Sequence, residues 1–315
     1  MDTPAAGFSG AIFGPQIHGC AACGSTHVKP WRKKAFSYTQ GRAAEMFNID
    51  RCEDCGSGFL NPPPSEAYLA SIYAFSGHGL TSPVRLADME ASERSFPNST
   101  LDAERLVRVG SALDLSGVAD SLDVGSGMGF ITREMKQQGR RAVSINPGAY
   151  ENAVFMEMHG HMPVVGMLAD YRPDRRFGLI VLSQVMEHML EPRAVTQRLA
   201  EMLAPGGVLA LAVPNFRSAA VALLGTKENG CLWVPEHVNY FSADGLSRMM
   251  RSAGLEVVRT AQVTRVRPDA IGRRIRVAKG LASAAVRLGQ IPAAAMLNAV
   301  GAGLHLNIYA RRAGA

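Results

Sequence analysis

The chain has 315 residues, enough for one large hydrophobic core or for one core with a small satellite. Hydrophobic residues make up 47% of it and charged residues 19%, which excludes a disordered or fibrous chain and is typical of a globular enzyme. The 33 Lys and Arg residues outnumber the 27 Asp and Glu residues, but they form no long block, so charge alone does not indicate a polyanionic partner. The sequence contains neither a long apolar run nor a signal-peptide pattern, so we expect no transmembrane segment and a cytoplasmic location.

Two Cys-x-x-Cys pairs dominate the N-terminal part, and each pair is followed by a glycine that suits a tight metal-binding turn. Four thiolates in a tetrahedral arrangement saturate Zn²⁺, so the metal would have a structural role. We therefore predict an N-terminal arm and zinc ribbon over residues 1–64. Its ligands would be Cys20, Cys23, Cys52 and Cys55. The fifth cysteine, Cys231, is expected to be a small buried residue.

Residues 65–100 are mostly polar and follow a proline run, Pro62–Pro64, which cannot extend a helix or a ladder. Ser65 can cap a short helix over Glu66–Tyr73. We therefore predict a linker that contains one short helix.

From residue 101 onward, apolar strands alternate with amphipathic helices, which predicts a parallel sheet covered on both faces. A turn is expected at Ala204–Gly207, and residues 268–302 are expected to form a helical insertion or lid. The predicted strands are 121–124, 141–145, 178–182, 208–213, 255–259 and 304–311, and the predicted helices are 101–114, 130–138, 149–159, one starting near 192, and 243–252.

The segment Leu122–Gly129 (LDVGSGMG) follows an apolar strand and begins a helix. Glycines in such a turn let the backbone bend sharply and approach a ligand, which a Cβ atom would prevent. Asp123 at the end of the strand can accept a hydrogen bond from a ligand ammonium group.

This segment resembles motif I of class I S-adenosylmethionine (SAM)-dependent methyltransferases, and similar motifs follow in the order that this superfamily has them. They are 177–182, 187–188, 203–207, 213–215 and 236–242, and the resemblance covers residues 101–312. It implies a Rossmann-like α/β fold with a seven-stranded sheet, an antiparallel last strand, and SAM over the carboxyl ends of the strands. Residues 52–64 are similar to the zinc ribbon that precedes some bacterial methyltransferases acting on sugar nucleotides or natural products.

The resemblance also implies cofactor contacts. Asp123, Gly125, Ser126 and Gly127 would line the methionine part of SAM, Met167 and Leu168 would flank the adenine, and Ser183 and Gln184 would close over the cofactor. Periodicity alone would instead make Met167 and Leu168 ordinary core residues.

One position departs from the family pattern, because Asn146 stands where an acidic residue usually grips the ribose hydroxyls. An amide loses the charge-assisted hydrogen bond, a difference of about 1–2 kcal/mol. This predicts SAM binding weakened about ten-fold. A modified cofactor and a non-catalytic SAM sensor remain alternatives.

His237 is the candidate general base, because Glu236, His237 and Tyr240 resemble the block that carries the proposed base in sugar C-methyltransferases. A neutral imidazole can deprotonate an acceptor hydroxyl or an acidic carbon. In the alternative interpretation His237 only bridges the loop before helix 243–252. His188 is expected to be structural.

The sequence thus predicts a SAM-dependent methyltransferase that acts on a small polar metabolite, a sugar-type or natural-product intermediate, by O- or C-methylation. An RNA methyltransferase that uses the ribbon for RNA contact is an alternative, although Ser183–Met186 lacks the motif used for exocyclic amines. A non-catalytic SAM-binding regulator is another. Residues 268–302 could form a lid, a homodimer contact or a peripheral membrane contact.

Overall fold

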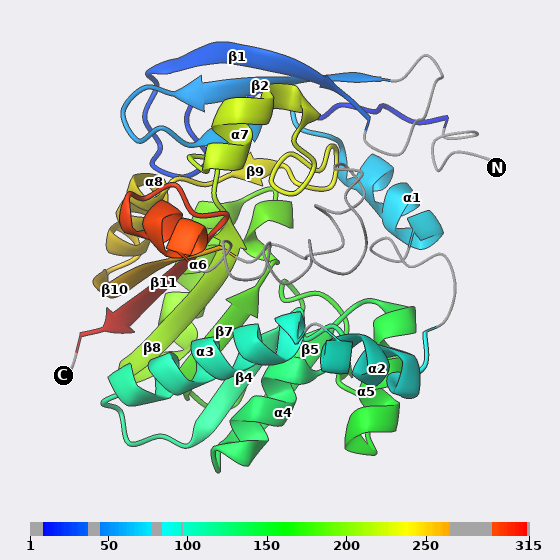
Figure 1. Cartoon of the computed structure of the whole chain (residues 1–315), viewed down its shortest axis with the longest axis vertical. Coiled ribbons are helices and arrows are strands. Elements are labelled where there is room, and N and C mark those ends of the chain that lie inside the picture. The colour runs from blue at the N-terminus through cyan, green and yellow to red at the C-terminus, as the bar shows by residue number, and fades with distance from the viewer. Residues whose placement is uncertain (1–8, 37–44, 77–83, 96, 265–291, 314–315) are drawn as a thin grey trace.

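The computed structural model describes residues 9–36, 45–76, 84–95, 97–264 and 292–313. Figure 1 shows a small sheet that contains the N-terminal strands, lying above a larger sheet flanked by helices. The predicted α/β fold with a seven-stranded sheet is confirmed.

The larger sheet has the strand order β10-β11-β8-β7-β4-β5-β6. β11 is antiparallel to both of its neighbours, while the neighbours from β8 to β6 pair in parallel. The antiparallel last strand that the resemblance implied is therefore present. The strands are β4 (Asp120–Val124), β5 (Arg141–Asn146), β6 (Val164–Val165), β7 (Phe177–Ser183), β8 (Leu203–Pro214), β10 (Leu255–Val263) and β11 (His305–Arg312).

Both faces of this sheet are buried, which explains why its central strands are almost entirely apolar. Leu179 and Val181 of β7 pack in one core cluster with residues of α3 and α4. Ile180 and Leu182 point to the other face and pack with residues of α6 and α8. The helices between residues 86 and 252 are α2 (Leu86–Ser95), α3 (Asn98–Leu113), α4 (Phe130–Gln137), α5 (Ala149–His159), α6 (Pro192–Met202), α7 (Ala219–Leu224) and α8 (Ala243–Ser252), with short 3₁₀ turns at Met186–His188 and Gly225–Lys227.

The small sheet has the order β1-β2-β3-β9, with all pairs antiparallel. Its first three strands are β1 (Val28–Ala35), β2 (Met46–Cys52) and β3 (Gly58–Leu60), whereas β9 (Asn239–Tyr240) comes from the second half of the chain. A shared core lies beneath this sheet, where Phe47 and Tyr68 pack with Phe216 and Tyr240. The domain boundary expected at residue 64 stays a prediction, because this core extends across it.

The segment expected to be a linker is more helical than predicted. The expected helix is α1 (Glu66–Ser76), and the N–H of Tyr68 donates to the Ser65 hydroxyl at 3.1 Å, as the capping prediction required. A second helix, α2, follows, and α3 begins at Asn98. The sequence of α2, LADMEASERS, is polar and largely exposed, so it lacks the apolar periodicity by which a helix is predicted.

A turn and a helical insertion were also expected in the second half of the chain. The turn expected at Ala204–Gly207 is an irregularity inside β8, where the pairing with β7 shifts register and Gly206 has φ +79°. Of the expected insertion 268–302, only 292–302 lie among the described residues, and 292–299 are helical. None of the described helices is long and apolar enough to cross a membrane.

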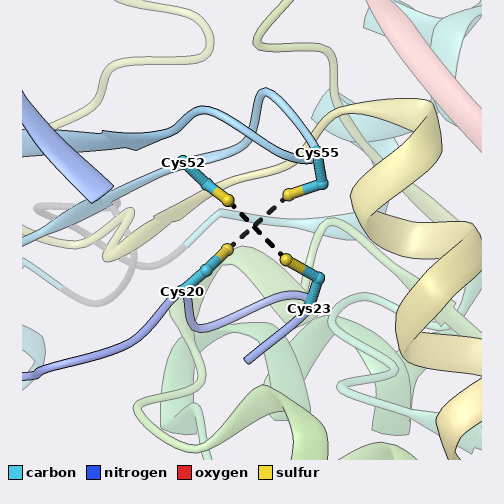
Figure 2. Close-up of side chains that lie close together, drawn as sticks. All are labelled: Cys20, Cys23, Cys52 and Cys55. Carbon is cyan, nitrogen blue, oxygen red and sulfur yellow. Dashed lines mark hydrogen bonds between the residues drawn. The ribbon is translucent and has the colours of Figure 1, made fainter. Parts of the chain in front are cut away.

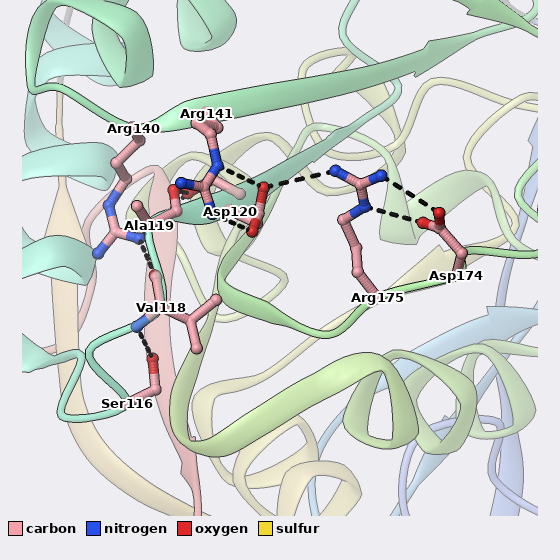
Figure 3. Close-up of polar contacts among 9 residues, drawn as sticks. Ser116, Val118, Ala119, Asp120, Arg140, Arg141, Asp174 and Arg175 are labelled. Carbon is pink, nitrogen blue, oxygen red and sulfur yellow. Dashed lines mark hydrogen bonds and ion pairs between the residues drawn. The ribbon is translucent and has the colours of Figure 1, made fainter.

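Ion pairs hold the amino ends of the central strands (Figure 3). Arg141 pairs with Asp120 at 2.5 Å, and Arg175 reaches both Asp120 and Asp174. The exposed members of this network contribute little to stability. The Arg140–Asp114 pair is nearly buried, with the two charged groups 2.6 Å apart, and it links the segments that precede β4 and β5 at the amino ends of these strands.

Candidate cofactor and acceptor site

The glycine-rich turn lies at the carboxyl end of β4, directly before α4. Gly125 has φ +67°, and a Cβ atom there would lie 2.5 Å from Cγ2 of Val185. Gly127 has φ +50° and open space around its missing side chain. The Ser126 hydroxyl is buried and has no hydrogen-bond partner among the described residues. An open backbone beside an unpartnered hydroxyl suits a polar ligand at this turn.

Asp123 is 1% exposed, and its carboxylate accepts a 2.7 Å hydrogen bond from the Thr132 hydroxyl. Thr132 and Ser144 are in turn 2.7 Å apart, so the carboxylate is held in place. Burial raises the pKa of Asp123 to about 7. A bound ammonium group would supply the positive charge that this buried carboxylate lacks, so the residues of this turn fit the methionine part of SAM.

Asn146, at the end of β5, is committed to local contacts. Its Oδ1 accepts a 3.3 Å hydrogen bond from the N–H of Gly127, while Nδ2 donates to Oδ1 of Asn152 at 2.8 Å and to the carbonyl of Gly148 at 3.3 Å. The amide therefore ties the glycine-rich turn to the start of α5.

The other expected cofactor residues differ in environment. Met167 is 52% exposed, whereas Leu168 is buried in a core cluster, so the two do not share one surface. Ser183 ends β7, and Gln184 after it is exposed and has φ +58°, unusual for a residue with a side chain. The N–H of Gln184 donates to the carbonyl of Ala212 at 2.8 Å, which holds this bend. Cofactor contacts by these residues stay predictions.

His237 lies in the loop before β9 with its Nδ1 2.8 Å from the carbonyl of Cys231. Because a carbonyl can only accept, this contact assigns the proton to Nδ1 and leaves Nε2 unprotonated. Burial lowers the pKa of His237 to about 4, so the ring is neutral near pH 7. Its ring meets that of His188 edge to face, with centroids 4.8 Å apart. The structure thus brings the two candidate histidines together.

Glu187 was not predicted as a site residue, although it lies at the centre of this group. It is 1% exposed, and neither carboxylate oxygen has a hydrogen-bond partner among the described residues. Burial raises the pKa of Glu187 to about 8. One of its oxygens and one ring nitrogen each of His188 and His237 lie within 4.8 Å of one another, close enough to hold a divalent cation or to share a proton. The Glu-His pair directly after the carboxyl end of β7 was the signal in the sequence.

Tyr73 of α1 also reaches this group, with its hydroxyl 3.3 Å from Nδ1 of His188. The two other expected catalytic residues lie elsewhere. Glu236 is buried and accepts a 3.1 Å hydrogen bond from the indole of Trp233. Tyr240 is buried on β9 and stacks on Phe216, with ring centroids 5.7 Å apart. These contacts favour structural roles for Glu236 and Tyr240.

The four ribbon cysteines converge on one point (Figure 2). The Sγ atoms of Cys20 and Cys55 are 3.6 Å apart, and those of Cys23 and Cys52 are 3.7 Å apart. A tetrahedral site with Zn–S bonds of about 2.3 Å has sulfur–sulfur edges of about 3.8 Å, so the cluster matches the size of a four-thiolate zinc site.

The glycine after each cysteine pair forms the expected tight turn. Gly24 has φ +78° and donates its N–H to the carbonyl of Cys20 at 2.8 Å, and Gly56, at φ +73°, does the same to Cys52 at 3.0 Å. The hydrogen bond between the thiols of Cys20 and Cys55 lowers the pKa of Cys55 and raises that of Cys20, so Cys55 is the one of the two that ionises first. Thiolates are the form that binds a metal.

Comparisons with known proteins identify the family to which the chain belongs. A profile of the family described as "Methyltransferase domain" matches residues 102–260, which is half of the chain. Two curated proteins similar to the chain are ubiquinone biosynthesis O-methyltransferases. The one from Bradyrhizobium sp. is 30% identical over 41% of this chain and 53% of its own length, and the one from Rhodopseudomonas palustris (strain BisA53) is 26% identical over 44% and 59%. The chain thus matches just over half the length of these relatives.

A solved structure extends the comparison of the fold. It is a SAM-dependent methyltransferase from Thermotoga maritima, described as a possible histamine N-methyltransferase. It matches with a TM-score of 0.50 and 14% identity, covering 76% of this chain and 99% of that one. At this identity the match supports the fold alone.

Proposed function

We propose, from the premise that this chain belongs to the methyltransferase-domain family of SAM-dependent methyltransferases, that it methylates a small polar metabolite beside His237. The observation that carries the proposal is the place of His237. It is a neutral histidine that lies against His188 and Glu187. These two residues follow the carboxyl end of β7. The glycine-rich turn follows the carboxyl end of the adjacent strand, β4. The acceptor and the cofactor would therefore meet at one edge of the sheet.

SAM, when bound, would supply an electrophilic methyl group on its sulfonium sulfur. Asp123 would hold the ammonium group of its methionine part, and the open backbone at Gly127 would let the cofactor approach. The unprotonated Nε2 of His237 would take the acceptor's proton as the acceptor's oxygen or carbon takes the methyl group and the carbon–sulfur bond breaks. S-adenosylhomocysteine, the methylated product and a protonated His237 would result. Proximity would supply most of the remaining rate enhancement.

O-methylation is favoured over C-methylation, because the curated relatives are O-methyltransferases. The sugar-type or natural-product class stays our proposal for the acceptor. Cys20, Cys23, Cys52 and Cys55 would hold a structural zinc ion, whose role is to support the fold.

Calorimetric titration of the zinc-loaded full chain with SAM and with S-adenosylhomocysteine tests the proposal first. We expect micromolar binding of both. Mass spectrometry of reactions with a panel of hydroxylated acceptors would then detect an added methyl group. Failure of both ligands to bind would contradict the proposal, and binding without turnover of any acceptor would favour a SAM-binding regulator.

A further inference from the structure

Glu151 is a buried carboxylate that no contact in the fold explains. It lies in the first turn of α5, five residues after Asn146. It is 7% exposed, and its Oε2 is fully buried without a hydrogen-bond partner among the described residues. Buried carboxylates are normally paired or hydrogen-bonded, because desolvation is otherwise costly. The positive end of the α5 dipole favours an anion here but leaves the oxygen without a donor.

Glu151 folds back toward the end of β5, where Asn146 lies. A Cβ atom on Gly148 would collide with Oε2 of Glu151 and would lie 3.3 Å from Nδ2 of Asn146. The two side chains therefore flank a single point beside Gly148. The missing side chain of Gly148 is what allows the carboxylate to reach this place.

The ordinary explanation for a glutamate at this helix position is a capping box, in which the carboxylate accepts the N–H of the N-cap residue. Gly148 is the N-cap of α5, but no hydrogen bond between it and the carboxylate of Glu151 is present. No ion pair among the described residues involves Glu151 either. Oε2 of Glu151 thus lies at the end of β5 and makes no hydrogen bond there to any described residue.

The end of the second sheet strand of the fold is where the ribose of SAM is expected. Asn146 occupies that position, but its amide already accepts from Gly127 and donates to Asn152 and Gly148. After accepting from Gly127, the Asn146 oxygen has one lone pair left and can accept from one ribose hydroxyl at most. The two oxygens of the Glu151 carboxylate can accept from both hydroxyls of a ribose.

We propose that Glu151 binds the ribose hydroxyls of SAM in place of the acidic residue that Asn146 replaces. The two tasks of that position are then divided between two residues: Asn146 holds the glycine-rich turn and Glu151 grips the diol. This inference rests on the proposed function, since it requires SAM to bind at this edge.

Calorimetric titration of the zinc-loaded full chain with S-adenosylhomocysteine and with its 2′-deoxyribose analogue tests it without any need for turnover. Glu151→Gln should weaken binding of S-adenosylhomocysteine about ten-fold, since it removes one charge-assisted contact. The wild type should prefer the natural ligand to the deoxy analogue, and Glu151→Gln should remove most of that preference. Glu157→Gln, on the exposed side of the same helix, is the matched control and should leave both affinities unchanged.

A rescue variant makes the test sharper. Asn146→Asp restores an acid at the usual position, so the double variant Asn146→Asp/Glu151→Gln should recover most of the lost affinity. Unchanged affinity of a folded, zinc-loaded Glu151→Gln protein, with its preference for the ribose intact, would overturn the inference while leaving the proposed function standing. No binding of S-adenosylhomocysteine by the wild type would overturn both.

Discussion

The hydroxyl of Ser242 donates a 2.6 Å hydrogen bond to the carbonyl of Cys55, and the same oxygen accepts the N–H of Gly245 at 2.9 Å. One side chain thus joins the four-cysteine cluster to the first turn of α8. Nearby, the N–H of Leu60 donates to the carbonyl of Val238, next to His237. The loop that carries His237 is therefore held between the ribbon and the large sheet.

Loss of the metal should consequently damage both stability and catalysis. Because metal ligation by a site of this kind is part of the folding free energy, Cys52→Ser should lower the free energy of unfolding by at least about 3 kcal/mol. Denaturant unfolding together with zinc analysis would measure this. Cys231→Ala, which removes the thiol outside the cluster, should keep one zinc per chain. A zinc-free Cys52→Ser protein with normal stability and turnover would contradict the structural role.

Replacing His237 should separate binding from turnover. His237→Gln removes the unprotonated nitrogen without adding a charge, so we expect a fall in kcat of about 100-fold or more. The Kd for S-adenosylhomocysteine should change by less than about two-fold, because our proposal has His237 contact the acceptor and not the cofactor. The exposed His161→Gln variant serves as the control and should retain full activity. Retained turnover in His237→Gln would remove this residue from the reaction.

Stability without ligand should fall as pH rises above neutrality. Burial raises the pKa of Asp123 to about 7 and that of Glu187 to about 8, so the folded chain binds more protons than the unfolded chain in this range. Such groups stabilise the folded state below their unfolded pKa values, and this contribution is lost as pH rises through the folded values. Burial of His237, whose pKa falls to about 4, acts in the opposite sense only below its ordinary value of 6.5.

We therefore expect the free energy of unfolding to decrease by about 2 kcal/mol between about pH 6.5 and 8. Urea unfolding at several pH values would show it. Glu187→Gln cannot ionise and should remove most of this slope. An equal slope in wild type and variant would exclude Glu187 as its source.

SAM binding should release a proton at mildly acidic pH. Near pH 6 the buried Asp123 is mostly protonated, and the ammonium group of the ligand would favour its charged form. Titrations in two buffers of different ionisation enthalpy should report close to one proton released per ligand. Asp123→Asn should abolish this release and weaken binding. Buffer-independent heats at pH 6 would argue against an Asp123–ammonium contact.

Gly125→Ala should destabilise the protein for two reasons at once. The residue has φ +67°, and the added Cβ would lie 2.5 Å from Val185. We expect a loss of about 2–3 kcal/mol, with weaker SAM binding as the turn shifts. Gly117→Ala provides a matched comparison, because Gly117 has nearly the same φ, +68°, but nothing within 4 Å of its Cβ position. Gly117→Ala should lower the free energy of unfolding by about 1 kcal/mol. Equal losses in the two variants would show that the Val185 side chain can move away from the added Cβ at no energetic cost.

The parts of the fold that could be predicted from the sequence are those set by local signals. β7 was predicted to within one residue at each end, because a continuous apolar strand is buried on both faces. α8 was predicted at the observed residues, since Ser242 caps it and Gly254 follows it. β9 was not predicted, because a two-residue strand exists only through its pairing with β3.

The site was predicted less completely, for a related reason. The candidate base and the cysteines follow from motif and spacing. Glu187 and Glu151 become candidates only because their carboxylate oxygens are buried without a hydrogen-bond partner among the described residues. Only packing from distant segments creates that condition. The catalytic role of Tyr240 stays a prediction, and its closeness to His237 in sequence does not reveal that its ring packs in the core shared with the ribbon.

The pairing of β3 with β9 also bears on how this protein could be recombined with its relatives. A ribbon excised at residue 64 would leave behind the strand that completes its sheet and the aromatic residues Phe216 and Tyr240 that complete its core. Exchanging ribbons between such enzymes would therefore require transplanting residues 216–242 as well. The N-terminal strands thus form only part of their sheet and core, and the segment that carries the candidate base supplies the rest.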